Sequence, residues 1–222
     1  MLCQYARGRV LCSSRVRRYY STVTWKYCEG VCSRSIRSFT TLSHVDDQSH
    51  RPTMVDVSTK MSTVREAEAQ TSIILPSAVL DTVLKSQILS PASKEPDNTT
   101  STEVLSPKGA VFSTAIVAGT MAVKQTSSLI PFCHPLPINS CKFDIRFSES
   151  EFSQQPQKII IRCKVKTEGQ TGVEMEALTG VSVAALTVYD MLKALSHNIV
   201  IQDTRLVSKT GGKFDYQSGV EA

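Results

Sequence analysis

The sequence predicts an α+β domain in which helices cover one face of a single antiparallel sheet. Three observations lead to this fold class. Segments rich in β-branched residues recur along the chain, two long segments carry apolar residues at helical spacing, and these segments follow one another as strand, helix, strand, strand, helix, strand. That order is the β-α-β-β-α-β pattern of a two-layer sandwich. A chain of 222 residues has room for one such domain with appendages.

The first strand and the first helix are predicted near the start of the domain. Residues 54–60 (MVDVSTK) have no clear period and are expected to form an extended arm, whereas residues 71–75 are β-prone. Pro76 and Ser77 can then begin a helix that runs through Leu84. Serine, threonine, proline and asparagine dominate residues 86–107, which predicts a flexible surface loop that adds little to the core.

A second helix is predicted after Lys108 and Gly109. Its apolar positions are occupied by small residues, which indicates close backbone packing against another element. Pro131 and Pro135 end the helix and hold residues 132–134 between them on a stiff loop. The apolar positions of this helix are Val111, Ala115, Ala118 and Ala122.

The C-terminal half completes the pattern with two strands, the longest helix and a last strand. Residues 140–147 and 158–166 are β-like, and residues 199–206 form the last predicted strand. The helix between them is expected over residues 174–196. Its apolar stripe reads Val181, Ala184, Ala185, Val188, Leu192 and Leu195.

The first 44 residues have the composition of an organelle transit peptide. They hold seven arginines and one lysine but a single acid, Glu29, and no apolar run of the length that a secretory signal requires. We therefore expect residues 1–50 to be a disordered mitochondrial presequence and linker, directing the chain to the mitochondrial matrix, and residues 51–222 to be the folded domain. A basic arm that binds nucleic acid and a plastid destination remain alternatives for this segment.

The charge and the cysteine content of the rest of the chain argue against several classes of protein. Beyond residue 44 there are 17 basic and 19 acidic residues, so bulk charge gives no reason to expect nucleic-acid binding. No apolar run is long enough to span a membrane. Cys133, Cys141 and Cys163 are an odd number without CxxC spacing, and only His134 and His197 accompany them. We therefore expect neither a disulfide framework nor a metal site.

Polar residues on the longest predicted helix are candidates for chemistry. Asp190 and Lys193 are one turn apart and form either a surface ion pair or an acid–base pair. Glu176 is 14 residues before Asp190, which places the two within about 40° of each other around the helix. Glu174 and Glu176 lie in the first turn, where they either complement the helix dipole or accept hydrogen bonds from a guanine-like edge.

Two further segments are candidates for substrate contacts. Cys133 could be a nucleophile, but no His–Asp relay is visible nearby, so we expect Cys133 and His134 to contact substrate instead; a purely structural His134 is the alternative. Residues 209–213 (KTGGK) resemble a phosphate-binding tail, because glycines let backbone amides approach an anion and lysines supply charge. They lack the P-loop spacing, and a frayed, solvated C-terminus is the alternative.

Together these segments resemble the cyclic pyranopterin monophosphate synthases, also called molybdenum cofactor biosynthesis protein C. The resemblance covers residues 54–213 and implies a ferredoxin-like fold assembled as a hexamer, a trimer of dimers, with sites at subunit interfaces. It implies a lyase that converts 3′,8-cyclo-7,8-dihydro-GTP to cyclic pyranopterin monophosphate and releases pyrophosphate, without metal or cofactor. The matching segments are MVDVSTK (54–60), TVREAEA (63–69), LIPFCHPLP (129–137), TGVEMEALTGVSVAALTVYDMLKA (171–194) and SKTGGK (208–213).

The resemblance assigns roles position by position. The catalytic lysines and aspartate fall on Lys108, Lys193 and Asp190, and a triphosphate substrate explains the need for local positive charge. The substrate-binding positions are Arg65, His134, Glu174, Met175, Glu176 and Lys209.

The chain also departs from the family pattern at four positions. Ala110 stands where the family commonly has the aspartate of Lys-Gly-Asp-Val, and Phe214 begins the segment where Ser-Gly usually follows Gly-Gly-Lys. Ile116 and Gln125 replace basic residues. A non-catalytic scaffold of the same fold and a nucleotide-binding module are therefore the alternative functions.

Overall fold

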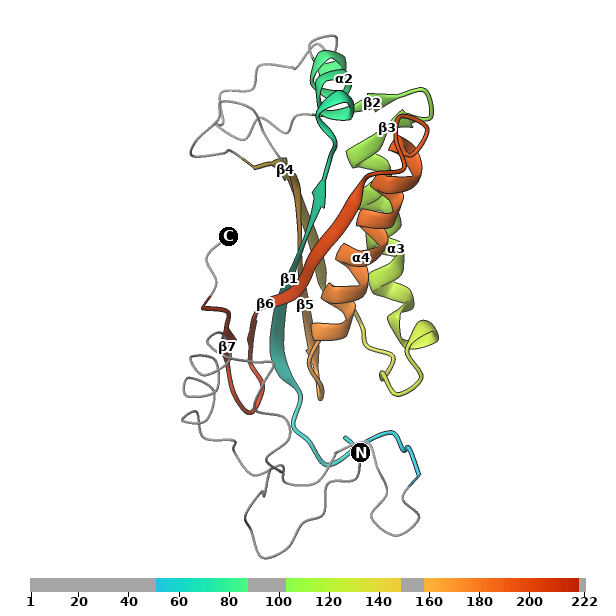
Figure 1. The fold of residues 1–222 in the computed structure, drawn as a ribbon. Coiled ribbons are helices and arrows are strands. Elements are labelled where there is room, and N and C mark those ends of the chain that lie inside the picture. The colour runs from blue at the N-terminus through green and yellow to red at the C-terminus, as the bar shows by residue number, and fades with distance from the viewer. Residues whose placement is uncertain (1–50, 88–102, 149–157, 220–222) are drawn as a thin grey trace, which may run out of the picture.

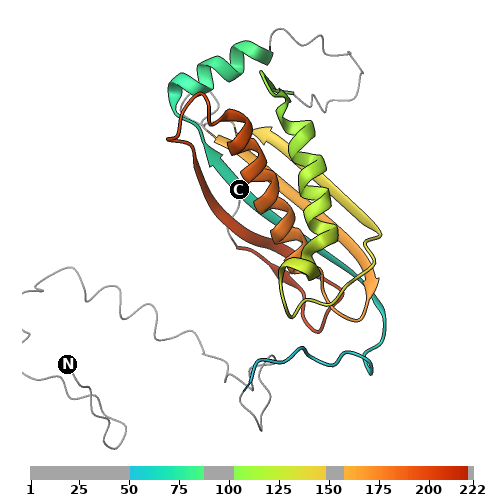
Figure 2. The ribbon, with the colours of Figure 1, turned by 90° about the vertical axis from the view of Figure 1, so that its right-hand side faces the viewer.

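The computed structural model describes residues 51–87, 103–148 and 158–219, and these form two layers. One layer is a five-stranded antiparallel sheet, and the other is a pair of helices, α3 (Val111–Leu129) and α4 (Glu174–Leu192), that lie side by side on one of its faces (Figures 1 and 2). The sheet consists of β4 (Ser140–Phe147), β5 (Lys158–Gly169), β1 (Thr63–Ile74), β6 (Val200–Thr210) and β7 (Tyr216–Gln217), in that spatial order.

This strand order confirms the predicted fold class. Leaving aside β7, the order β4-β5-β1-β6 places the first and third strands of the β-α-β-β-α-β unit at the centre, as in a ferredoxin-like sandwich. A short helix, α2 (Ser77–Gln87), follows β1, and a hairpin of β2 (Leu105–Ser106) and β3 (Gly109–Ala110) precedes α3.

The central strand β1 is much longer than residues 71–75, which are all that local composition predicts. It pairs with β5 along its whole length, from Thr63 opposite Gly169 to Ile74 opposite Lys158. Residues 66–69 alternate glutamate with alanine, and successive side chains of a strand point to opposite faces. Ala67 and Ala69 are therefore buried on the helix-covered side, while Glu66 and Glu68 point to the open face. Because charged residues and alanine replace β-branched residues here, local composition does not predict this part of the strand.

The two helices approach each other and the sheet through glycine. A Cβ atom on Gly119 of α3 would lie 2.5 Å from the ring of Phe143, and one on Gly180 of α4 would lie 2.7 Å from Val123. Neither position has room for a larger side chain. The predicted small residues Ala115 and Ala122 are buried, but the closest approach is made at these two glycines, which the sequence prediction did not name. Close contact between the helices follows, and α4 lies across β1, β5 and β6.

Two details of the sequence prediction are corrected. The longest helix ends at Leu192 rather than residue 196, because the backbone turns there, with the Leu195 amide bonded to the Leu192 carbonyl; Leu195 is 46% exposed and outside the apolar stripe. In the segment expected to be a surface loop, residues 86–87 continue α2, residues 105–106 form β2, and Val104 is fully buried in the core. Residues 88–102 and the predicted presequence 1–50 lie outside the described residues.

By length and composition alone, α4 could cross a membrane, since its mean hydropathy over 18 residues is 1.2. Half of that window is buried within this fold, against the central strands. A core helix of a two-layer sandwich has the same composition, so the finding is weak evidence for a membrane span.

Candidate functional site

The residues that the sequence singles out fall into two groups at opposite ends of α4. Helix geometry separates Glu174 from Asp190 by about 24 Å, because each residue advances the axis by roughly 1.5 Å. Within one copy of the chain, the structure therefore does not bring all the predicted site residues together. The group at the start of the helix contains Arg65, Cys133, His134, Glu174, Met175, Glu176 and Lys209, and the group at its end contains Lys108, Asp190 and Lys193.

The group at the C-terminal end of α4 is an aspartate held between two lysines. Lys193 Nζ donates to one oxygen of the Asp190 carboxylate at 2.7 Å, and Lys108 Nζ donates to the other at 2.9 Å. Lys108 also donates to the Asp190 backbone carbonyl at 2.8 Å. All three side chains are about half exposed, so they are open to a ligand. Lys108 reaches this site from the β2–β3 hairpin, 82 residues away in sequence.

These contacts fix the protonation state of the group. The hydrogen bonds from Lys193, and then from Lys108, lower the pKa of Asp190 to about 2, and the same contact raises the pKa of Lys193. At neutral pH, Asp190 is a carboxylate and Lys193 is an ammonium. Both shifts stabilise the charged pair, so Asp190 is a weaker base than a free aspartate and Lys193 is a weaker acid than a free lysine.

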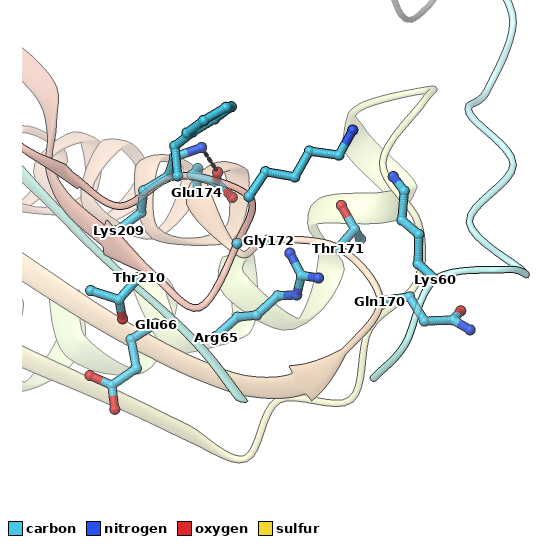
Figure 3. A pocket seen from close by; sticks show the side chains of 12 residues that line it. Lys60, Arg65, Glu66, Gln170, Thr171, Gly172, Glu174, Lys209 and Thr210 are labelled. Carbon is cyan, nitrogen blue, oxygen red and sulfur yellow. Dashed lines mark hydrogen bonds and ion pairs between the residues drawn. The ribbon is translucent and has the colours of Figure 1, made fainter. Parts of the chain in front are cut away.

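The group at the N-terminal end of α4 borders a cavity of about 300 Å³ with a positively charged lining. Figure 3 shows side chains from the arm, β1, the β5–α4 turn and the end of β6 converging on it. Two of its cations are already partnered: Lys209 donates to Glu174 at 2.8 Å, and Arg65 donates from Nε to the Gly169 carbonyl at 3.0 Å. The basic residues in the lining are Lys60, Arg65, Lys209 and Lys213.

Residues 209–217, which border this cavity, are paired in the sheet rather than frayed, although residues 210–217 are exposed, as the alternative of a solvated segment has it. Strand β7 pairs with the end of β6, with Lys209 opposite Tyr216. Gly211 has a φ of 80° and lies so close to β1 that a Cβ atom there would overlap the carbonyl oxygen of Val64. Only glycine fits this position, and the bend it permits brings Lys209 and Lys213 to the same cavity.

Glu176 lies deeper than the rest of the group, and Cys133 is close enough to feel its charge. Glu176 is 4% exposed, and burial, then the nearby Glu174 carboxylate, raises its pKa. Burial and the charge of Glu176 in turn raise the pKa of the Cys133 thiol, which makes it a poorer nucleophile. Glu176 therefore holds a proton more readily than an exposed glutamate and is not part of the cavity lining.

His134 makes the structural contact that the sequence left open as an alternative. Its Nε2 atom is 2.9 Å from the carbonyl oxygen of Val55, so it must carry the hydrogen to make this bond. The bond ties the loop after α3 to the arm of residues 54–60, whose last residue, Lys60, reaches the cavity. Met175, on the first turn of α4, is partly exposed.

Lys213 lines the cavity, as the predicted phosphate-binding tail of residues 209–213 suggested, but sequence reasoning missed Lys60. Lys60 belongs to a segment that carries the family resemblance, yet nothing in its spacing indicates that it faces this cavity. Phe214, 71% exposed, adds an aromatic ring to the lining at a position of departure from the family pattern. In the described ranges, no three His, Cys, Asp or Glu side chains are grouped as metal ligands would be.

The first prediction concerns the pKa of Asp190. Replacing Lys193 with alanine removes the largest cause of its lowering, so we expect the pKa to rise from about 2 toward 3.8, and Lys108→Ala to raise it less. In the wild type the ion pairs persist at pH values above 3.8 and are lost as the pH falls through about 2. Carboxyl carbon NMR titration measures this. Arg146→Ala on β4 is the control, and an unchanged pKa in Lys193→Ala would contradict the geometry.

Comparison with known proteins agrees with the resemblance noted from the sequence. Residues 54–212 match the MoaC family. The chain is 49% identical over 183 residues to the cyclic pyranopterin monophosphate synthase of Xanthomonas oryzae pv. oryzae, covering 82% of this chain and 94% of that protein. It is 48% identical over 171 residues to molybdenum cofactor biosynthesis protein 1 of Dictyostelium discoideum, covering 77% of this chain but 26% of the relative.

A third relative is a molybdenum cofactor biosynthesis bifunctional protein of Synechocystis, 47% identical over 169 residues, which cover 76% of this chain and 44% of the relative. The chain thus spans nearly the whole of the Xanthomonas protein and less than half of the other two. The match over most of the chain confirms the predicted family. The chain belongs to the MoaC family.

Proposed function

We propose that the chain is a cyclic pyranopterin monophosphate synthase, a lyase of molybdenum cofactor biosynthesis. It converts 3′,8-cyclo-7,8-dihydro-GTP to cyclic pyranopterin monophosphate and releases pyrophosphate. The relative that matches this chain over nearly its own full length carries that name. The observation in the structure that supports it best is the carboxylate of Asp190 held between Lys108 and Lys193.

The basic cavity supports a polyphosphate substrate. A triphosphate carries several negative charges, and the four basic side chains of the lining can neutralise them and stabilise departing pyrophosphate. Among the described contacts, only Lys209 of these four forms an ion pair with a carboxylate of the cavity, which is the carboxylate of Glu174. Glu174 can then turn to the N–H groups of the guanine-derived ring when phosphate takes its place on Lys209.

The rearrangement of the ring requires proton transfers, which the Asp190 group can carry. Lys108 and Lys193 are donors fixed on the two oxygens of one carboxylate, so their positions are set before substrate arrives. Either lysine can give a proton to a leaving nitrogen and become a neutral amine. Asp190 then stays paired with the ammonium group of the other lysine. Glu176, with its raised pKa, is a second proton carrier at the other end of α4.

The proposed catalytic residues and the proposed substrate-binding residues can act on one substrate molecule only if two copies of the chain contribute to one site. The two groups are about 24 Å apart along α4. A homo-oligomer, a hexamer built as a trimer of dimers as the resemblance implies, would bring the end of one α4 to the start of another. Large apolar side chains on the outer faces of both helices support such contacts: Val117 is 61%, Met121 54% and Leu186 58% exposed.

The second prediction tests the activity. Residues 51–222, given 3′,8-cyclo-7,8-dihydro-GTP, should release pyrophosphate and form the pterin product in equal amounts, and Lys193→Ala should lower kcat by about 10³-fold while substrate binding is largely kept. Pyrophosphate release and the fluorescence of the oxidised product measure the two products. Arg146→Ala is the control. Binding without either product in the wild type would favour the scaffold or nucleotide-binding alternatives.

The third prediction tests the shared site. Lys193→Ala and Lys209→Ala damage opposite ends of α4, so each should be inactive as a pure oligomer. After unfolding and refolding of an equal mixture, half of the interfaces are mixed, and one of the two sites at each mixed interface carries no substitution. Activity should therefore return to roughly a quarter of the wild type. A mixture as inactive as its parents, although it forms oligomers, would show that the two ends do not share a site.

The fourth prediction concerns location. We propose that residues 1–50 direct the chain to the mitochondrial matrix, supported by their arginine-rich, acid-poor composition. These residues, placed ahead of a fluorescent protein, should carry it into the matrix, and replacing Arg15, Arg17 and Arg18 with alanine should leave it in the cytosol. Accumulation of the unsubstituted fusion in the cytosol or in plastids would contradict the proposal.

A further inference from the structure

The first turn of α3 is capped by a residue from outside the helix. Ala110 occupies the N-cap position, with the extended backbone typical of a cap but no side-chain acceptor. The amides of Phe112 and Ser113, which need acceptors, instead donate to the carboxylate of Glu103 at 2.8 and 3.0 Å. The Ser113 hydroxyl donates to the same carboxylate at 2.5 Å.

Glu103 also anchors the hairpin that carries Lys108. Its carboxylate accepts from the amide of Val104 at 2.8 Å, and the Val104 carbonyl accepts from the amide of Val111 at 2.8 Å. Residues 103 and 104 therefore close the base of the β2–β3 hairpin against the first turn of α3. Val104 is fully buried, so this base is fixed in the core.

The tip of the hairpin depends on that base. Ser106 Oγ accepts from the Lys108 amide at 3.1 Å and donates to the Gly109 carbonyl at 3.2 Å. Gly109 has a φ of 112°, a conformation that strongly favours glycine. This tight turn directs Lys108 to the Asp190 carboxylate and backbone carbonyl. The hydrogen bonds of Glu103 and Val104, together with that of the Thr114 hydroxyl to the Ala110 carbonyl at 2.6 Å, hold the base of the hairpin to α3.

The N-cap residue itself explains why a carboxylate is needed there. Ala110 has no side-chain acceptor for the free amides of the first turn. An aspartate at an N-cap accepts hydrogen bonds from the second and third helical amides, which here are those of Phe112 and Ser113. Glu103 bonds to the same two amides. It supplies from seven residues upstream the carboxylate that Ala110 lacks.

We infer that Glu103 is a positioning residue of the synthase: by capping α3 and closing the β2–β3 hairpin, it holds Lys108 on Asp190. This inference rests on the proposed function for its effect on turnover. Burial acts to raise the pKa of Glu103, but the hydrogen bonds from Ser113, Phe112 and Val104 outweigh it, and the net pKa is lowered. The group is therefore ionised at neutral pH, as a cap at the positive end of a helix dipole should be.

The fifth prediction tests this role with a rescue. In the full-length protein, Glu103→Ala should lower kcat by about 10- to 100-fold and change KM much less, because a small displacement of a catalytic lysine impairs the chemical step. Adding Ala110→Asp to Glu103→Ala restores a carboxylate to the same two amides and should recover most of the lost kcat. Asp144→Ala, which removes an exposed carboxylate of β4, is the matched control.

Amide hydrogen exchange provides a readout that does not depend on activity. In Glu103→Ala, exchange should accelerate about tenfold over residues 104–113 and stay unchanged in β1, and the double variant should return to the wild-type rate. If the wild type releases no pyrophosphate, the proposed function fails, and the exchange data still decide whether Glu103 clamps the hairpin. Unchanged exchange or unchanged kcat in Glu103→Ala would overturn the inference, as would a double variant no better than the single one.

If Glu103→Ala does not fold, Glu103→Gln takes its place. The glutamine oxygen can still accept from Val104 and Phe112, but its NH₂ group then faces the Ser113 amide, so the cap is half lost. An intermediate loss of kcat with faster exchange at Ser113 supports the clamp, and wild-type values for both refute it.

Discussion

The close packing of α4 on the central strands is the constraint on which both parts of the site depend. Gly180 has no room for a side chain between Val123, Cys163 and Phe143, so the helix lies on the sheet at one distance and with one rotation. With the helix fixed, its first turn faces the end of β6 and its last turn faces the β2–β3 hairpin (Figure 1). A change in the core would therefore displace both groups of polar residues together.

The two groups use charge in different ways. At the end of α4, one carboxylate and two ammonium groups satisfy each other before any ligand is present, so the geometry is preorganised. At its start, four cations share a small cavity with Glu66 and Glu174, which leaves an excess of positive charge in the lining. The first group is thus a closed set of ion pairs and the second a basic cavity, and buried Glu176, with its raised pKa, lies near the second.

The fold could be predicted from the sequence further than the site. Helix α3 and strand β4 follow from spacing and composition, because their apolar residues repeat with the right period. Most of β1 does not follow from local composition. Its charged residues are held in a strand by pairing with β5, and no local pattern in the sequence shows that pairing. The Lys108–Asp190 contact joins residues 82 positions apart, and no sequence pattern predicts it; the family resemblance only assigned the two residues to one site. The cap from Glu103 depends on a hairpin inside a segment whose polar composition predicts a loop.

The arm of residues 54–60 sets a limit on maturation. His134 holds Val55 by a hydrogen bond, the Ser58 carbonyl accepts from Gln170 at 3.5 Å, and Lys60 lines the cavity. An organelle that removes a leader from this chain must therefore cut before Val55. A cut after Lys60 would leave the sheet and core intact but would remove one cation from the cavity and the bond that holds the loop after α3. The position of the cut thus decides whether the cavity keeps Lys60.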